Sequence, residues 1–205
     1  MRTGGTITGT VERRSTRELR MPRPRRGDDV LQAALGRFYR EGITATGVDA
    51  LTADAGIAKM TLYNNFGSKD DLVVAYLAER DRRFFAQLDA ELAQRRDALD
   101  RALAPVDLYE RYLHEEGFRG CAFVNAAAEL PAEHPGRETI SAHKARLRDR
   151  WAALIADLDV ADASQTARAC LCLLEGAYVL GGLAVDDDGL TAARALIVQR
   201  LTGDG

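Results

Sequence analysis

The chain has 205 residues, of which 46% are apolar and 29% charged, a composition typical of a soluble globular protein with one or two domains and a buried core. No stretch approaches the ~18–20 uncharged apolar residues of a membrane helix. Residues 1–26 also lack the apolar block of a signal peptide, so we expect a cytoplasmic protein with no membrane partner.

The net charge of −3 is distributed unevenly along the chain. Residues 1–26 carry eight arginines and two glutamates, a net charge of +6, whereas the rest of the chain carries −9. This contrast predicts a flexible basic arm over 1–26 whose partner is a polyanion. The alternative is a solvated tail that its charge keeps soluble. Met21 is a second candidate start of translation, which would remove most of the arm.

After the arm, the apolar residues recur with helical spacing. The predicted helices span about 28–40, 48–55, 59–66, 69–95, 98–115, 121–130, 139–157, 163–180 and 190–201. No segment alternates with a period of two over a useful length, so we predict no strands. The expected fold is all-α, with about nine helices.

The second and third helices are short and separated by a turn. Gly42 suits a left-handed end of the first helix, and Gly56 permits the reversal between the second and third. Thr46 is expected to cap the second helix, with Asp49 three residues further on in the capping-box position. Two short helices joined by a glycine-containing turn and packed on a preceding helix form the layout of a helix-turn-helix.

The third helix is expected to bury Leu62 and to leave a polar surface outside. That surface comprises Lys59, Met60, Thr61, Tyr63, Asn64 and Asn65. Asparagine can bond an adenine edge, threonine and methionine can touch a thymine methyl, and lysine and tyrosine can reach phosphate. No acid occurs from Gly56 to Lys69, although residues 27–75 contain seven. This pattern favours a helix that enters the major groove of double-stranded DNA; the alternative is a surface helix that lacks acids by chance.

The run from Gly42 to Val48 and from Ala55 to Leu72 resembles the DNA-binding signature of the TetR family. The resemblance implies a helix-turn-helix domain over 27–75 and a helical ligand-sensing and dimerisation domain over 76–205. It places Thr46, Gly47, Tyr63 and Lys69 on backbone phosphate, and Lys59, Met60, Thr61 and Asn64 on the bases. A cation at Lys69, beside the N–H groups that begin the fourth helix, also suits phosphate on physical grounds.

Two positions depart from the family pattern. Ala58 replaces a common serine cap of the third helix, a loss of ~1 kcal/mol. Thr52 replaces a usual alanine where the two helices pack closely. Both departures concern stability more than function.

Beyond residue 75 the resemblance is one of architecture, and no ligand is implied. A mainly apolar pocket with a few polar anchors is typical of small-molecule sites. The candidate lining residues are Tyr109, Tyr112, Phe123, Asn125, Glu129, His143, Trp151 and Tyr178. The alternative is that these residues are core packing with a satisfied hydrogen-bond network.

The last two predicted helices are rich in small residues. These are Ala167, Ala169, Gly176, Ala177, Gly181, Gly182 and Ala184. The family forms homodimers through its last two helices as a four-helix bundle, and two reading helices are needed for useful specificity. The alternative is that the small residues pack within one chain.

No metal or other cofactor is expected. Cys170 and Cys172 point to opposite sides of a helix, and Cys121 and the three histidines show no ligand spacing, so reduced buried thiols are the simpler interpretation. We find no phosphate loop, serine elbow or paired carboxylates, and no motif supports Cys121 with His143 as a dyad.

The resemblance therefore implies a repressor that a small-molecule effector releases from its operator, by a shift of the long fourth helix. The alternatives are a TetR-like adaptor that has lost DNA binding or, less favoured, a helical enzyme.

Overall fold

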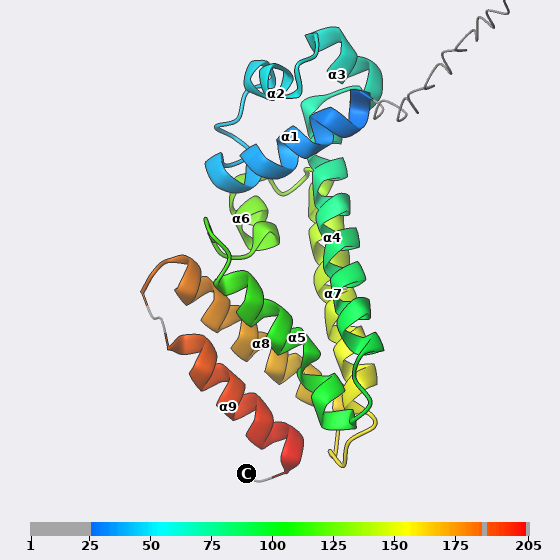
Figure 1. Cartoon of the computed structure of the whole chain (residues 1–205), viewed down its shortest axis with the longest axis vertical. Coiled ribbons are helices and arrows are strands. Elements are labelled where there is room, and N and C mark those ends of the chain that lie inside the picture. Colours follow the sequence, from blue (N-terminus) through cyan, green and yellow to red (C-terminus); the bar gives the residue numbers. More distant parts are fainter. Residues whose placement is uncertain (1–25, 186–187, 204–205) are drawn as a thin grey trace, which may run out of the picture.

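The computed structural model describes residues 26–185 and 188–203, so the basic arm predicted over 1–26 lies almost wholly outside the described residues. Within these ranges the chain forms nine α-helices and no strand, as predicted (Figure 1). They are α1 (Arg26–Glu41), α2 (Val48–Ala55), α3 (Lys59–Phe66), α4 (Lys69–Ala93), α5 (Ala98–Leu113), α6 (Ala122–Glu129), α7 (Gly136–Ile155), α8 (Ala163–Gly182) and α9 (Gly189–Thr202).

The short helices α2 and α3 begin and end where the sequence predicts, whereas two longer helices extend further. Helix α7 begins at Gly136 rather than near Thr139, because Pro135 occupies its N-cap, where a missing N–H costs nothing. Helix α8 continues to Gly182 rather than ending at Leu180. A Cβ atom on Gly182 would lie 2.7 Å from the Cα of Gly120, so the glycine allows the last turn to pack against that backbone.

Helices α1, α2 and α3 form one end of the molecule, which we call the head (Figure 1). Their inner faces supply buried Phe38, Leu51 and Leu62, and Tyr76 of α4 meets Phe38 edge to face at a centroid distance of 5.4 Å. This apolar core orients α2 and α3 with their other faces outward.

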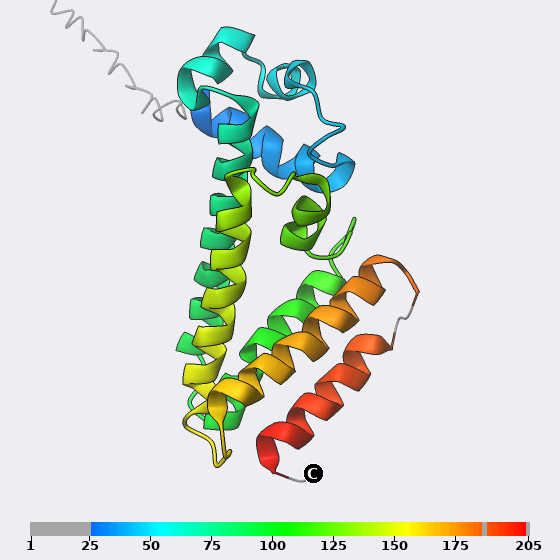
Figure 2. The ribbon, with the colours of Figure 1, turned by 180° about the vertical axis from the view of Figure 1, so that it is seen from behind.

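Helices α5 to α9 form the remainder of the molecule, which we call the body, and α4 joins it to the head. Helices α4 and α7 lie side by side along the molecule in both views, and α8 and α9 pack together at the end opposite the head (Figures 1 and 2). The predicted domain boundary at residue 75 falls inside α4, so one continuous helix belongs to both parts.

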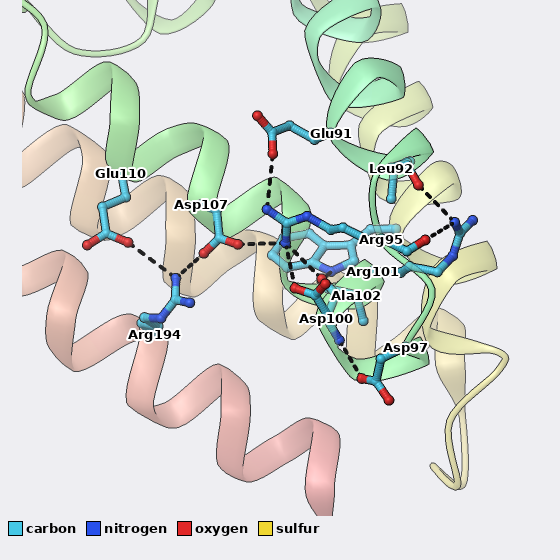
Figure 3. A network of polar contacts seen from close by, with 11 residues as sticks. Glu91, Leu92, Arg95, Asp97, Asp100, Arg101, Ala102, Asp107, Glu110 and Arg194 are labelled. Carbon is cyan, nitrogen blue, oxygen red and sulfur yellow. Dashed lines mark hydrogen bonds and ion pairs between the residues drawn. The ribbon is translucent and has the colours of Figure 1, made fainter.

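An ion-pair network attaches the end of α4 and helix α9 to α5 (Figure 3). Arg95, just after α4, lies 2.6 Å from the Asp107 carboxylate, and Arg194 of α9 pairs with both Asp107 and Glu110. Beside them, the indole N–H of Trp151 donates to the carbonyl of Ala102 at 2.8 Å. The Arg194 ion pairs hold α9 against α5.

Within the part of the chain that the structure describes, no helix combines the length and the hydropathy required to cross a membrane.

Candidate functional site

The outer face of α3 carries the polar side chains that the sequence predicts. Met60 and Tyr63 are 67% and 44% exposed, and Lys59 and Asn64 are also exposed. Thr61 is half-buried, and Leu62, fully buried, anchors the helix from inside. The helix thus presents a side-chain surface without a carboxylate of its own, supported by a rigid core.

The nearest acid to this surface comes from α2. Asp49 lies 2.6 Å from the Lys59 ammonium and is the main cause of a raised Lys59 pKa, which keeps this lysine charged. Both side chains are exposed, so water screens the pair and it contributes little to stability. Lys59 can therefore exchange Asp49 for a phosphate at little cost.

Two helix starts in the head have no side-chain cap. The N-cap residues are Gly47 for α2 and Ala58 for α3, and neither provides a side-chain hydrogen bond. The first backbone N–H groups of such helices lack intrahelical partners and attract anions. The expected missing cap at Ala58 is therefore observed, and Gly47 presents a second start suited to phosphate.

Thr46 does not have its predicted role, because Gly47 and not Thr46 is the N-cap of α2. The Thr46 side chain is buried, 1% exposed, and its hydroxyl donates to the Gly42 carbonyl at 2.6 Å. It closes the loop after α1, where Gly42 has φ +93°. Only the backbone at Thr46 remains near the start of α2, so its side chain is no candidate for phosphate contact.

Lys69 also differs from expectation. Its ammonium donates to the Ile43 carbonyl at 2.7 Å and is half-buried, and the start of α4 is already capped by Ser68, whose hydroxyl accepts from the Asp71 N–H at 3.0 Å. One ammonium donor and one helix-start N–H are thus already bonded, but the ammonium has two further donors, so the contact of Lys69 with phosphate stays a prediction. The observed role of Lys69 is to hold the loop between α1 and α2.

A cavity of about 260 Å³ lies where α1 and α4 meet the body. Five of the eight predicted pocket residues line it: Tyr109, Tyr112, Phe123, His143 and Tyr178. The wall also includes Tyr39, Arg80, Arg83, Phe84, Gln87, Glu115, Glu116, Phe118, Gly120, Cys121 and Ala122. The sequence pattern did not indicate Tyr39, which lies in α1 of the head, or Arg80, a charged residue of α4.

The other three predicted pocket residues lie outside the cavity. Trp151 is fully buried in the body core. The amide of Asn125 donates to the Arg119 carbonyl at 2.8 Å, which orders the segment before α6. The carboxylate of Glu129 accepts from the Thr44 N–H at 2.7 Å and so contacts the head. Each of the three has a structural partner instead of a place on the cavity wall.

The polar groups of the cavity form two small networks. The Tyr109 hydroxyl donates to Glu175 at 2.5 Å, and Lys144 bonds the same carboxylate while its ammonium lies 3.3 Å from the Cys121 sulfur. Burial, with the adjacent Glu175 carboxylate, raises the pKa of Tyr109 well above its ordinary value, so this phenol stays protonated.

His143 forms the second network with Asp81. Its Nδ1 lies 2.8 Å from Asp81, and its ring stacks on Phe123 at a centroid distance of 3.7 Å. Burial lowers the pKa of His143 to about 4, outweighing the hydrogen bond to Asp81, which acts to raise it. A neutral ring with Nδ1–H donating to Asp81 leaves Nε2 as an acceptor at physiological pH.

Together, the packed head and the exposed α3 define a helix-turn-helix DNA-binding protein with a helical body. Residues 30–76 match the sequence model for bacterial regulatory proteins of the tetR family. The structure of SCO4454, a TetR-family transcriptional regulator from Streptomyces coelicolor, is similar at 32% identity and a TM-score of 0.77, covering 87% of this chain and 93% of that one. The chain belongs to the TetR family of DNA-binding transcriptional regulators, and it is a regulator rather than an enzyme.

Two further relatives mark the range of similarity. The transcriptional activator FasR of Mycolicibacterium smegmatis is 28% identical over 123 residues, which span 55% of this chain and 56% of FasR. A TetR regulator from Chloroflexus aurantiacus shares the fold at a TM-score of 0.76 and 22% identity, covering 86% of this chain and 94% of that one.

Proposed function

We propose that this regulator is a homodimeric, cytoplasmic repressor that a small molecule in the cavity releases from its operator. Residues 27–75 bind DNA through α3 and the start of α2, and residues 76–205 sense the effector and dimerise. The observation that carries the proposal is the position of the cavity, whose wall includes Tyr39 of α1 and Arg80 of α4. A ligand there contacts the two helices that hold the reading helix.

The DNA contacts proposed are made by Lys59, Met60, Thr61 and Asn64 on base edges, and by Tyr63, Lys69 and the Gly47 N–H on phosphate. One eight-residue helix spans too few base pairs for useful specificity, so two copies about one turn of DNA apart are required.

The uncovered face of α8 and α9 supports the dimer. Leu180, Leu183 and Leu196 are 40%, 65% and 51% exposed on these two helices and the turn after α8. Gly176 lies on the same face of α8, and a Cβ atom there would meet nothing within 4 Å of its own chain. A second copy packed on this face would bury the leucines, and Gly176 would allow close approach of its backbone.

The predicted small residues divide between two roles. Ala167 and Ala177 are buried within the chain, and a Cβ on Gly181 would lie 2.7 Å from the Leu113 side chain. These positions match the alternative of packing within one chain, whereas Gly176 and Ala184 are exposed.

The name of FasR favours a second candidate, an activator. Both candidates use the same DNA contacts and differ in where the operator lies relative to the promoter. In a repressor, a bound dimer blocks polymerase; in an activator, it recruits polymerase from upstream.

The proposal is tested by selecting bound fragments from random DNA and confirming them by gel shift. The operator is then placed in a reporter promoter, and compounds are screened for release of the DNA. A repressor lowers transcription until a compound releases it; higher transcription with the protein bound would establish the activator. Binding that is independent of sequence and of salt would contradict both.

A further inference from the structure

Arg80 in α4 is a cation on the cavity wall. Its guanidinium carbon lies 4.6 Å from the ring centroid of Tyr39 and 5.6 Å from that of Tyr76. One terminal nitrogen donates to the Leu35 carbonyl in α1 at 3.2 Å. The Nε atom is buried and has no hydrogen-bond partner among the described residues. A buried, charged donor without an acceptor is costly. Because Nε is closed off from solvent, a ligand in the cavity would meet the guanidinium through its terminal nitrogens.

No carboxylate of the described residues pairs with Arg80. Its neighbours Arg82 and Arg83 both pair with the Glu79 carboxylate, each at 2.7 Å. The acids on the cavity wall, Glu115 and Glu116, are exposed after α5, where water screens them. Arg80 is therefore the cation of the cavity that lacks a counter-ion.

The rest of the wall is largely aromatic. Its rings belong to Phe84, Tyr109, Tyr112, Phe118, Phe123 and Tyr178. Aromatic walls favour flat ligands through edge-to-face and offset contacts. The volume of about 260 Å³ is below the ~300–1,000 Å³ of sites for drug-sized molecules, so a small ligand is required.

We propose that the effector is a small aromatic carboxylic acid, held as its anion by Arg80 with its ring among the aromatic side chains. The inference rests on the proposed function, because it assigns the ligand class of the same cavity. The carboxylate supplies the counter-charge that Arg80 lacks, and a guanidinium can bind a carboxylate through two parallel hydrogen bonds. It also competes with the Leu35 carbonyl for Arg80, which links ligand binding to α1 of the head.

The test uses the full-length protein, isothermal titration calorimetry and pairs of probes with the same shape. The pairs are benzoate and benzamide, cinnamate and cinnamamide, and 1-naphthoate and 1-naphthamide. At least one acid should bind ~10-fold or more tightly than its amide, the ratio expected for a hydrogen bond to a charged group.

Arg80→Met should remove this preference for the acid. Arg83→Met is the matched control, since it removes a cation from the same helix and the same wall that already has a carboxylate partner in Glu79. It should keep the preference. Loss of the preference in Arg83→Met but not in Arg80→Met would overturn the assignment.

Arg80 also contacts α1, so a second variant guards against loss of folding. Arg80→Lys keeps the charge without the planar fork, and it should retain acid binding at reduced affinity while circular dichroism shows unchanged helix content. Equal binding of acids and amides by the wild-type protein, or no binding of any acid, overturns the inference.

Gel shifts with the selected operator separate this inference from the proposed function. If no acid binds but a neutral or cationic compound releases the DNA, only the ligand class is wrong. If acids bind through Arg80 but no compound releases the DNA, the ligand class stands and the proposed release fails.

Discussion

The carboxylate of Glu129 in α6 accepts a hydrogen bond from the backbone N–H of Thr44, at 2.7 Å, in the loop between α1 and α2. Gly42 has φ +93°, and a Cβ atom added to it would lie 3.1 Å from the oxygens of the same carboxylate. Helix α6 also contributes Phe123 to the cavity wall. One short helix therefore contacts both the cavity and the loop that leads into α2.

Glu129→Ala should weaken the attachment of this loop. It leaves the Thr44 N–H without its protein acceptor, and we expect unfolding to require ~1 kcal/mol less free energy, with weaker operator binding. Chemical denaturation and gel shifts measure both effects. Glu133→Ala, which removes an exposed acid just after α6, is the control and should change neither quantity. Equal effects of the two substitutions would show that net charge, not the hydrogen bond, matters.

Adjacent positions in α3 should act on different properties. Tyr63 is 44% exposed, so Tyr63→Ala should abolish operator binding while the thermal midpoint and the dimer remain unchanged. Leu62 is fully buried, so Leu62→Ala should lower the free energy of unfolding by ~2–5 kcal/mol. Gel shifts and thermal unfolding distinguish them. Unchanged DNA binding by Tyr63→Ala would contradict the proposed reading face.

Gly176→Arg should separate the proposed dimer. A side chain at this position meets nothing within 4 Å of its own chain, so the protomer should fold, whereas a partner at close approach would clash. We expect a monomer in analytical ultracentrifugation and a large loss of operator affinity. The control is Ala90→Arg, which adds the same charge at an exposed site of α4. A Gly176→Arg variant that stays dimeric would place the interface elsewhere.

His143 should make the protein less stable in acid. Burial lowers its pKa to about 4, below its ordinary value of 6.5. As the pH falls from 6.5 towards 4, the unfolded chain binds a proton that the folded chain does not, so stability decreases across this window and is unaffected above it. The full effect is up to about 3 kcal/mol, and ~2 kcal/mol is expected at pH 5.

The variant His143→Gln should show a smaller loss of stability between pH 7.5 and pH 5.0 in urea denaturation. His114→Gln removes an exposed histidine and should retain the wild-type pH dependence. The interpretation would fail if the His143 variant lost as much stability as the wild-type protein.

Deleting residues 1–20 should reduce the salt dependence of operator binding. The deletion removes five arginines, and each phosphate contact contributes ~0.9 to the slope of log affinity against log salt concentration. The preferred DNA sequence should not change, because base contacts come from α3. An unaltered slope would mean that the arm does not touch DNA.

Features set by neighbouring residues could be predicted from the sequence. The bounds of α2 and α3 agree with the structure because apolar spacing, glycine and the end of each pattern are local signals. The exposed face of α3 follows from the same spacing once Leu62 is assigned to the interior. The missing side-chain cap at Ala58 could also be recognised without a fold.

The roles of Thr46, Lys69 and Glu129 could not be predicted in this way. Lys69 bonds a carbonyl 26 positions away, and Glu129 bonds an N–H 85 positions away. A single polar residue carries no periodic signal that identifies so distant a partner. Their types suggested phosphate and ligand contacts, and only the folded structure shows that all three bond the backbone of the loop between α1 and α2.

The amino-acid pattern by itself determined that the chain is helical and that one short helix is suited to DNA, because helical periodicity and an absence of acids are properties of consecutive residues. Only the tertiary structure decided which side chains surround the cavity, because Tyr39, Arg80 and Tyr178 meet there from three separate helices. It also left Arg80 without a counter-ion, since the ion pairs form between side chains that folding brings together.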